Sequence, residues 1–115
     1  MFPRQQRLHE AAAWRHVRRR GRCARGHHTV FYVVRSNEER FGFSTTKGFS
    51  DAVCRNKARR RLREAFRHVY GDQARPMAVT GTALPESLEL DFVALCAVVR
   101  AQLVELGLTV RVVQE

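Results

Sequence analysis

The stretch that most constrains the fold is SDAVCRNKARRRLREAFRHVY, at positions 50–70. On a helical wheel its apolar side chains gather on one arc. These side chains are Cys54, Ala58, Leu62, Ala65, Phe66 and Val69. The opposite arc is polar and basic, and it carries Asn56, Arg59, Arg60, Arg63 and Arg67. The pattern predicts a helix that buries one face against a core and leaves a basic face outside.

Both ends of this helix are marked in the sequence. Ser50 or Asp51 can cap its start by accepting a hydrogen bond from backbone N–H groups that have no partner within the helix. Gly71 is the expected stop, because glycine tolerates the left-handed turn that commonly ends a helix. The helix is therefore predicted to lie between these two signals.

The charge on the outer face is unusually one-sided. Glu64 is the only acid among seven lysines and arginines between Arg55 and Arg67. Like charges four residues apart repel one another along a helix. A solvated charged surface is the plain explanation, but a helix that accepts this repulsion is better explained by an anionic partner. Guanidinium groups pair with phosphate through two parallel hydrogen bonds, so the face predicts contact with nucleic acid.

The charge of the whole chain supports this prediction. The 115 residues fit a single domain, and the net charge is +10. Residues 1–67 carry a net charge of +13, whereas residues 68–115 carry −3. A balance of this kind points to nucleic acid or an anionic membrane surface. The basic function belongs to the first two-thirds of the chain, and the remainder is predicted to be scaffold.

Other classes of chemistry find no support in the sequence. The three cysteines, Cys23, Cys54 and Cys96, are far apart and form no Cys-x-x-Cys pair, so we expect no disulfide, no zinc site and a reducing cytoplasm. The five histidines are adjacent or scattered, and no other metal site is expected. Nucleotide-binding and hydrolase motifs are absent. The start, MFPRQQRLHE, has no apolar core of a signal peptide, and no apolar run reaches the ~18 residues of a membrane span.

The first half of the chain is predicted to form a helix and two strands. Residues 1–8 are expected to be a loose basic arm, followed by a helix from about His9 to Arg20 and a loop from Gly21 to His28. Thr29–Arg35 reads as a strand with apolar residues on both faces, which is typical of a central strand. Arg40–Thr46 is predicted to return as a second strand and complete a hairpin.

The second half is predicted to be strand, loop and helix. Met77–Thr82 is a short candidate strand, and 84–90 is expected to be loop. Asp91 can cap a last helix over Phe92–Leu106, closed by Gly107. The pattern leaves open a strand over Leu88–Cys96 instead, and 108–113 as a short strand or an ordered tail.

Two further features allow both a packing and a binding interpretation. Trp14 and Val17 face the same way on the first helix, where Trp14 either anchors the helix or lines a groove in which a base can stack. Gly42 and Ser44 lie on one face of their strand, where small residues admit another chain or leave a packing gap. Around Gly21 the positive field is extended by Arg15, Arg18, Arg19, Arg20, Arg22 and Arg25.

Residues 40–66, RFGFSTTKGFSDAVCRNKARRRLREAF, resemble the signature region of the bacterial ribonuclease P protein component. The matching positions are Gly42, Ser44, Lys47, Ala52, Val53, Arg55, Asn56, Lys57, Arg59, Arg60, Arg63, Ala65 and Phe66. Weaker likeness extends to Arg7, Leu8, Trp14, Val17 and Gly21. The sequence departs from the family pattern in the turn before the helix, at Gly48, Ser50 and Asp51.

The resemblance implies a single α/β domain of the two-layer α+β type, similar to some ribosomal proteins. The implied order is helix, three strands, helix, strand, helix. The resemblance also implies a left-handed βαβ crossover at the basic helix, against the strong right-handed rule.

The resemblance also implies a function. In that family an RNA subunit cleaves the 5′ leader from precursor tRNA with the help of Mg²⁺, so no catalytic side chain and no protein-bound metal are expected here. The implied contacts with the catalytic RNA are Arg55, Asn56, Lys57, Arg59, Arg60 and Arg63, and the helix wheel adds Arg67. The leader groove would be lined by Trp14, Val17 and Tyr32, with Lys47 near it. The implied partners are one ribonuclease P RNA per protein and the precursor-tRNA leader, with no DNA and no membrane.

Two other classes of function fit parts of the pattern. A structural RNA-binding protein of ribosomal type would share the electrostatics but would need no leader groove. A DNA-binding or membrane-surface module could use the basic amphipathic helix, although the modest side chains of its apolar arc suit packing on a sheet better than insertion into lipid. Exposure of Trp14 and Tyr32 on one concavity would favour the ribonuclease P interpretation.

Overall fold

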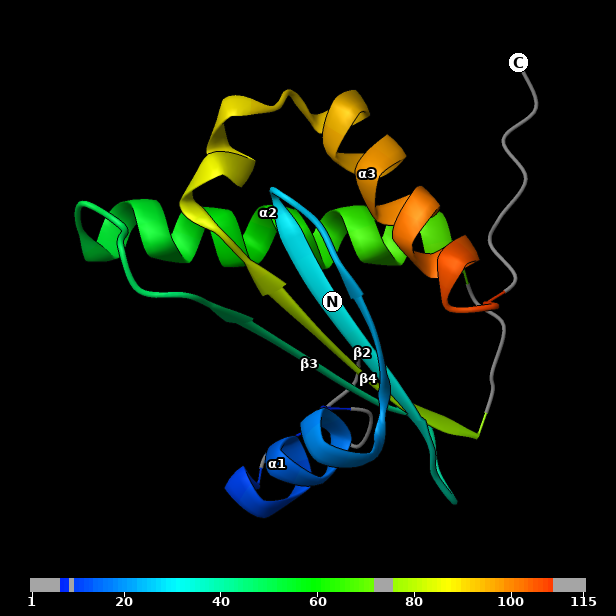
Figure 1. Ribbon diagram of the computed structural model, residues 1–115. Coiled ribbons are helices and arrows are strands. Elements are labelled where there is room, and N and C mark those ends of the chain that lie inside the picture. Colours follow the sequence, from blue (N-terminus) through cyan, green and yellow to red (C-terminus); the bar gives the residue numbers. More distant parts are fainter. Residues whose placement is uncertain (1–6, 9, 72–75, 109–115) are drawn as a thin grey trace.

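The computed structural model describes residues 7–8, 10–71 and 76–108. Three α-helices, one 3₁₀ helix and four strands follow one another in this part of the chain (Figure 1). Their bounds are α1 Ala11–Arg20, β1 Arg22–Arg25, β2 Thr29–Arg35, β3 Arg40–Thr45, α2 Ala52–Tyr70, β4 Met77–Ala83, η2 Pro85–Glu89 and α3 Phe92–Glu105. The element order implied by the family resemblance is confirmed.

Helix α2 forms where the apolar periodicity and the end signals predict it. The Asp51 carboxylate accepts a hydrogen bond from the Cys54 N–H at 2.8 Å, so Asp51 rather than Ser50 caps the helix. At the other end Gly71 takes a positive φ of 78° and ends the helix. The predicted apolar arc is buried, except for the half-buried Cys54 at its start.

The four strands form one sheet in the order β1-β2-β4-β3. β4 pairs antiparallel with β2 and parallel with β3. The predicted hairpin of β2 and β3 is therefore wrong, because β4 enters between them and takes the hydrogen bonds of both. The segment predicted as a short strand is a central strand of seven residues. Nothing in the local sequence of β2 and β3 encodes this insertion, since it depends on a partner more than thirty residues away.

The connection from β3 through α2 to β4 joins two parallel neighbours. In Figure 1, α2 lies behind the sheet, and the arrows of β3 and β4 both point to the upper left. If the picture is rotated in its plane until both arrows point upward, β4 lies to the right of β3. This arrangement is a left-handed crossover, as the resemblance predicts, and it places α2 and α1 on opposite faces of the sheet.

Strand β1 corrects the prediction of a loop over residues 21–28. It pairs antiparallel with β2, and the partners include Ala24 with Phe31. Only Ala24 is buried, whereas the other three residues of the strand are exposed. An edge strand of this kind shows no apolar alternation, so its sequence reads as a loop.

The two ends of the described chain differ from the sequence prediction in detail. Arg7 bridges to Phe41, and the Leu8 N–H donates to the Phe41 carbonyl at 2.7 Å, so these two residues run along the edge of β3 and are not a loose arm. α1 begins at Ala11, and the predicted starting residue His9 lies outside the described residues. The segment 84–90 contains a 3₁₀ helix where a loop was expected.

Helix α3 forms as predicted, and the alternative strand over 88–96 is wrong. The Asp91 side chain accepts a hydrogen bond from the Ala94 N–H at 2.8 Å. Gln102 points into the core, where its amide donates to the Thr29 carbonyl at 2.7 Å and its oxygen accepts from the Thr29 hydroxyl. This contact holds the end of α3 on the first residue of β2. The predicted tail beyond Leu108 lies outside the described residues.

The core lies between α2, α3 and one face of the sheet. Phe66 of α2 stacks on Tyr70 at a ring distance of 5.0 Å and packs against Phe31, Phe41 and Phe43 of the sheet. Successive residues of a strand point to opposite faces, so Gly42 and Tyr32 face the other side, where α1 lies.

Candidate nucleic-acid interface

The outer face of α2 carries the predicted basic residues. The exposed members are Arg55, Asn56, Lys57, Arg59, Arg60 and Arg67. Arg63 is half-buried, and its Nε is buried without a hydrogen-bond partner. The structure therefore brings all seven predicted RNA-binding residues of this helix onto one element, and it leaves most of their charge in solvent.

Among the described residues, none of these cations forms a salt bridge with an acidic side chain. Within residues 7–8, 10–71 and 76–108, the recorded salt bridge joins Arg40 to Glu38 in the turn before β3, far along the chain from α2. The one hydrogen bond recorded within the basic face runs from Arg59 Nη2 to Asn56 Oδ1 at 3.0 Å. Like charges without counter-ions repel, so the face is arranged to receive an anion.

Arg61 is the exception on this helix. Its guanidinium donates to the backbone carbonyls of Ser87, at 3.0 Å, and of Leu90. It therefore fastens η2 to α2 and is a structural residue. The helical wheel separates it from the basic arc, which is why it was not among the predicted contacts.

Trp14 lies on the opposite face of the sheet, with its ring on the backbone of β3. A Cβ placed on Gly42 would stand 2.3 Å from Trp14 Cζ2, so only glycine admits the ring there. The indole N–H donates to the Leu8 carbonyl at 3.0 Å. The space above Gly42 is thus filled by Trp14, and the ring anchors α1 while remaining half exposed.

Tyr32 shares this face of the sheet with Trp14. Tyr32 of β2 and Gly42 of β3 are both paired with Thr80 of β4, so the three residues form one row across the sheet. Two strand spacings separate Tyr32 from Gly42, which is about 10 Å. Both aromatic side chains are half exposed, so this face of the sheet presents two aromatic rings to solvent.

The other two predicted groove residues occupy different positions. Val17 is 1% exposed, because it holds α1 on the sheet, so it offers almost no surface to RNA. Lys47 is exposed and lies in the loop that follows the end of β3. Of the four predicted groove residues, Trp14 and Tyr32 therefore lie exposed on this face of the sheet, and Lys47 lies past the end of β3.

Two arginines on this face were not among the predicted groove residues. The Arg18 guanidinium lies 5.6 Å from the Trp14 ring centroid, close enough for a cation–π contact. Arg25 Nη2 donates to the Tyr32 hydroxyl at 3.1 Å. Each aromatic ring therefore has its own arginine. The spacing of four residues between Trp14 and Arg18 is the signal that could have identified the first pair.

A cavity of about 850 Å³ lies on the other flank of α1. Its wall includes Ala13, His16 and Val17 from the helix and Val34 and Ala78 from the sheet. Trp14, Tyr32 and Lys47 do not line it, so this cavity is not the concavity that was expected to expose Trp14 and Tyr32 together. Helix α1 therefore divides this face of the sheet into an aromatic side and a cavity side.

The turn that departs from the family pattern has a structural explanation. Gly48 has a φ of 101°, a backbone conformation that glycine adopts without strain. The hydrogen bond from the Cys54 N–H holds the pKa of Asp51 below its ordinary value, because it favours the ionised carboxylate. The diverged turn therefore positions and caps α2.

Two other kinds of site are absent from the part of the chain that the structure describes. No three histidine, cysteine or acidic side chains there lie close enough together to hold a metal ion. None of the helices in those residues combines the length and the apolar character that crossing a membrane requires.

Comparison with known proteins identifies the family. Residues 2–107 match the family model of ribonuclease P. The chain is 35% identical over 95 residues to the ribonuclease P protein component of Chlamydia trachomatis serovar A, covering 77% of this chain and 79% of the relative. It is 39% identical over 77 residues to the component of Thermus thermophilus, covering 67% of this chain and 45% of that longer relative.

Solved structures show the same fold. The ribonuclease P protein of Staphylococcus aureus superposes with a TM-score of 0.66 at 19% identity, covering 89% of this chain and 92% of the other. The Thermotoga maritima protein gives a TM-score of 0.64 at 23% identity, covering 87% and 93%. None of these comparisons favours the ribosomal-type alternative. The sequence signature, the arrangement of the elements and the family match agree, and the chain belongs to the ribonuclease P protein family.

Proposed function

We propose that the two faces of the sheet hold two different RNAs. The outer face of α2 docks the protein, one copy per RNA, on the ribonuclease P RNA, and the aromatic side of the opposite face holds the single-stranded 5′ leader of precursor tRNA. The protein would thereby keep the leader at a fixed place relative to the catalytic RNA and assist its removal.

The observation that carries the first half is the unpaired charge of α2. Six exposed polar or basic side chains lie on one helix, and none forms a salt bridge with a described residue. Binding to phosphate relieves their mutual repulsion and releases the counter-ions of the RNA. Arginine is suited to this role because its planar group donates two parallel hydrogen bonds to a phosphate.

The pair of half-exposed aromatic rings supports the second half. Single-stranded RNA is commonly bound by stacking unpaired bases on aromatic side chains within a positive groove. Trp14 and Tyr32 lie in one row of the sheet, and Arg18 and Arg25 supply positive charge beside each ring. Lys47 would meet the strand where it leaves the sheet.

In this proposal the RNA subunit carries out the hydrolysis with bound Mg²⁺. The protein faces that meet RNA are arginine-rich and repel cations, so the RNA phosphates are the better ligands for these ions. The protein would supply binding energy and position, as an accessory subunit of an endoribonuclease. Three free cysteines fit a reducing cytoplasm as the place of action.

Cleavage of precursor tRNA at limiting Mg²⁺ tests the docking face. The RNA subunit is assayed alone, with wild-type protein and with the Arg60→Ala/Arg67→Ala variant, which changes two exposed residues. Rescue of cleavage by the wild type and its loss in the variant are expected. An Arg22→Ala/Arg35→Ala variant removes the same charge elsewhere and should retain rescue. Equal rescue by all three proteins would exclude α2 as the docking face.

A further inference from the structure

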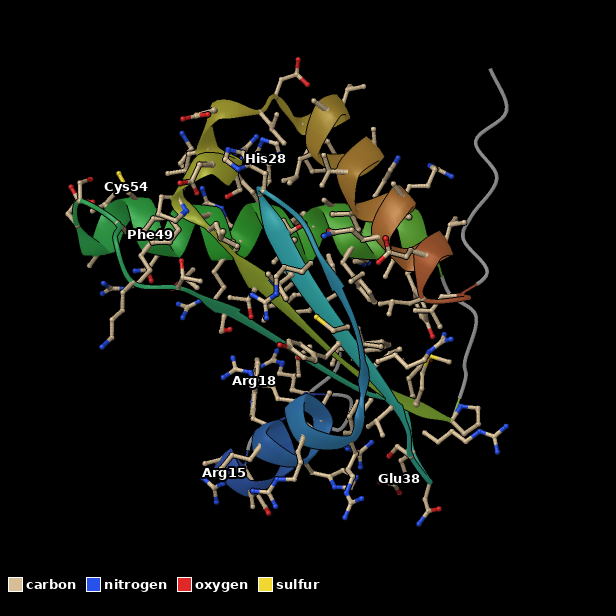
Figure 2. The ribbon with its side chains drawn as sticks, viewed as in Figure 1. Arg15, Arg18, His28, Glu38, Phe49 and Cys54 are labelled. Carbon is tan, nitrogen blue, oxygen red and sulfur yellow. The ribbon has the colours of Figure 1, made fainter. Side chains whose placement is uncertain are left out.

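Helix α1 carries a second set of unpaired cations, on the side of the sheet opposite α2. We name Arg15, Arg18 and Arg19 the α1 ridge. All three are exposed, and none forms a salt bridge with a described residue. Figure 2 shows Arg18 extending from α1 toward the sheet, while Arg15 extends away from the molecule. The ridge therefore runs from the aromatic side of the sheet over the outer surface of α1.

The stability of α1 does not explain all three of these residues. Cations in the last turn of a helix interact favourably with its dipole, which accounts for Arg18 and Arg19. Arg15 lies one turn earlier, where it gains less from the dipole and stands at repelling distances of three and four residues from the other two. The helix has ten residues and buries only Val17 fully, so it has little stability of its own, and this repulsion lowers that stability further.

The position of Arg18 indicates the partner. Its guanidinium lies over the Trp14 ring, so it belongs both to the ridge and to the aromatic side of the sheet. A strand that stacks a base on Trp14 would pass Arg18 next and then reach Arg15 and Arg19. These two are about 40° apart around the helix and one turn apart along it, so their charges follow one line.

We propose that the α1 ridge binds the phosphodiester backbone of the precursor-tRNA leader where the leader continues past the aromatic side of the sheet. The inference rests on the proposed function and extends it to leader nucleotides farther from the cleavage site. The contact is to phosphate rather than to bases, so it raises affinity with leader length and is insensitive to leader sequence.

The test uses the holoenzyme and precursor tRNAs whose leaders are lengthened one nucleotide at a time. For wild-type protein, affinity should rise first as the leader reaches Trp14 and then again as it reaches the ridge. The Arg15→Gln/Arg19→Gln variant should keep the first gain and lose the second. With long leaders its slope of log affinity against log salt should fall by about 0.7 for each phosphate that the variant no longer neutralises.

Two further variants make the test specific. Arg22→Gln/Arg35→Gln removes two exposed arginines outside the ridge and should retain both gains. Arg15→Lys/Arg19→Lys keeps the charge and should retain most of the second gain. Thermal melting of each free protein checks that the fold is unchanged.

Each remaining result counts against the inference. If the glutamine variant retains the second gain, the ridge does not bind the leader, although the leader proposal stands. If it weakens a leaderless substrate equally, the ridge contacts another RNA segment. If wild-type affinity is independent of leader length, the proposed leader site itself is wrong, and the inference fails with it.

Discussion

The ring of Trp14 lies directly on the backbone of Gly42, where a Cβ would stand 2.3 Å from Cζ2. One contact thus fixes the distance between α1 and the edge of the sheet. It also sets the height of the indole above the surface on which we place the leader. The two residues are separated by β1 and β2 in the chain, and the fold brings them together.

Gly42→Ala tests this contact. The added methyl group must push the indole away, and overpacking of this kind costs about 1–3 kcal/mol of folding free energy. We expect a lower denaturant midpoint and altered fluorescence of Trp14, the only tryptophan in the chain. Thr45→Ala, on the same strand, should leave the fluorescence unchanged. An unaltered emission spectrum in Gly42→Ala would show that the ring does not lie there in solution.

The hydrogen bond between Arg25 and Tyr32 predicts that substitutions of the two residues have non-additive effects on leader binding. Arg25 donates to the Tyr32 hydroxyl and so orients the ring. Arg25→Met and Tyr32→Phe should each weaken binding of leader-bearing substrate and spare leaderless substrate. The double variant should be no weaker than the poorer single variant, because both changes remove the same hydrogen bond. Additive losses would mean that Arg25 contacts RNA independently.

Arg60 and Arg61 are neighbours with opposite predicted roles. Arg61→Ala removes two hydrogen bonds to the backbone around η2, so it should lower the free energy of unfolding by about 1–3 kcal/mol. Arg60→Ala should leave stability within about 0.5 kcal/mol of wild type but reduce the salt dependence of RNA binding. Chemical denaturation and salt-dependent binding of both variants measure the two effects. A reversed pattern would contradict the assignment.

Gln102→Leu tests the buried amide that joins α3 to β2. The substitution leaves the buried Thr29 hydroxyl without its partner, and the Thr29 carbonyl keeps only the hydrogen bond from the Gly26 N–H, which should cost about 1–3 kcal/mol. Urea denaturation compares it with Val104→Thr, a change at an exposed position of the same helix. Equal stability of the leucine variant and wild type would show that the amide contributes nothing net.

Asp51 predicts a pH dependence at the start of α2. Its pKa is lowered in the folded protein, chiefly by the hydrogen bond from the Cys54 N–H, so ionisation stabilises the fold. That contribution is present above the unfolded pKa, about 3.9, and is lost as the pH falls through the lower folded value. Asp51→Asn retains a capping oxygen but cannot ionise. Its melting temperature should therefore fall less than that of wild type as the solution is acidified below that range.

The sequence predicts α2 well because everything that determines it is local. Its apolar arc, its cap at Asp51 and its stop at Gly71 all lie within the helix or beside it. The separation of Arg60 from Arg61 follows from the same periodicity. The family resemblance added the number of strands, which the local pattern did not contain.

The pairing of the strands was harder to predict from the sequence than α2. β2 and β3 are adjacent in sequence, and each is apolar enough to pair with the other, so a hairpin was the natural prediction. The pairing that forms depends on β4, whose own sequence contains Gly81 and looks weak. For Trp14, the sequence left anchoring and base stacking as alternatives, and only the position of Gly42 shows that the ring anchors α1.

The central place of β4 has a consequence for how the protein is made. Residues 1–67, which carry a net charge of +13, are synthesised before the strand that separates β2 from β3. Until Ala83 has been added, neither the surface under α1 nor the support of α2 can be completed, since both rest on a sheet that β4 joins. Nascent chains shorter than this would carry the arginines without the geometry that selects an RNA, so recognition is acquired only after β4 has been synthesised.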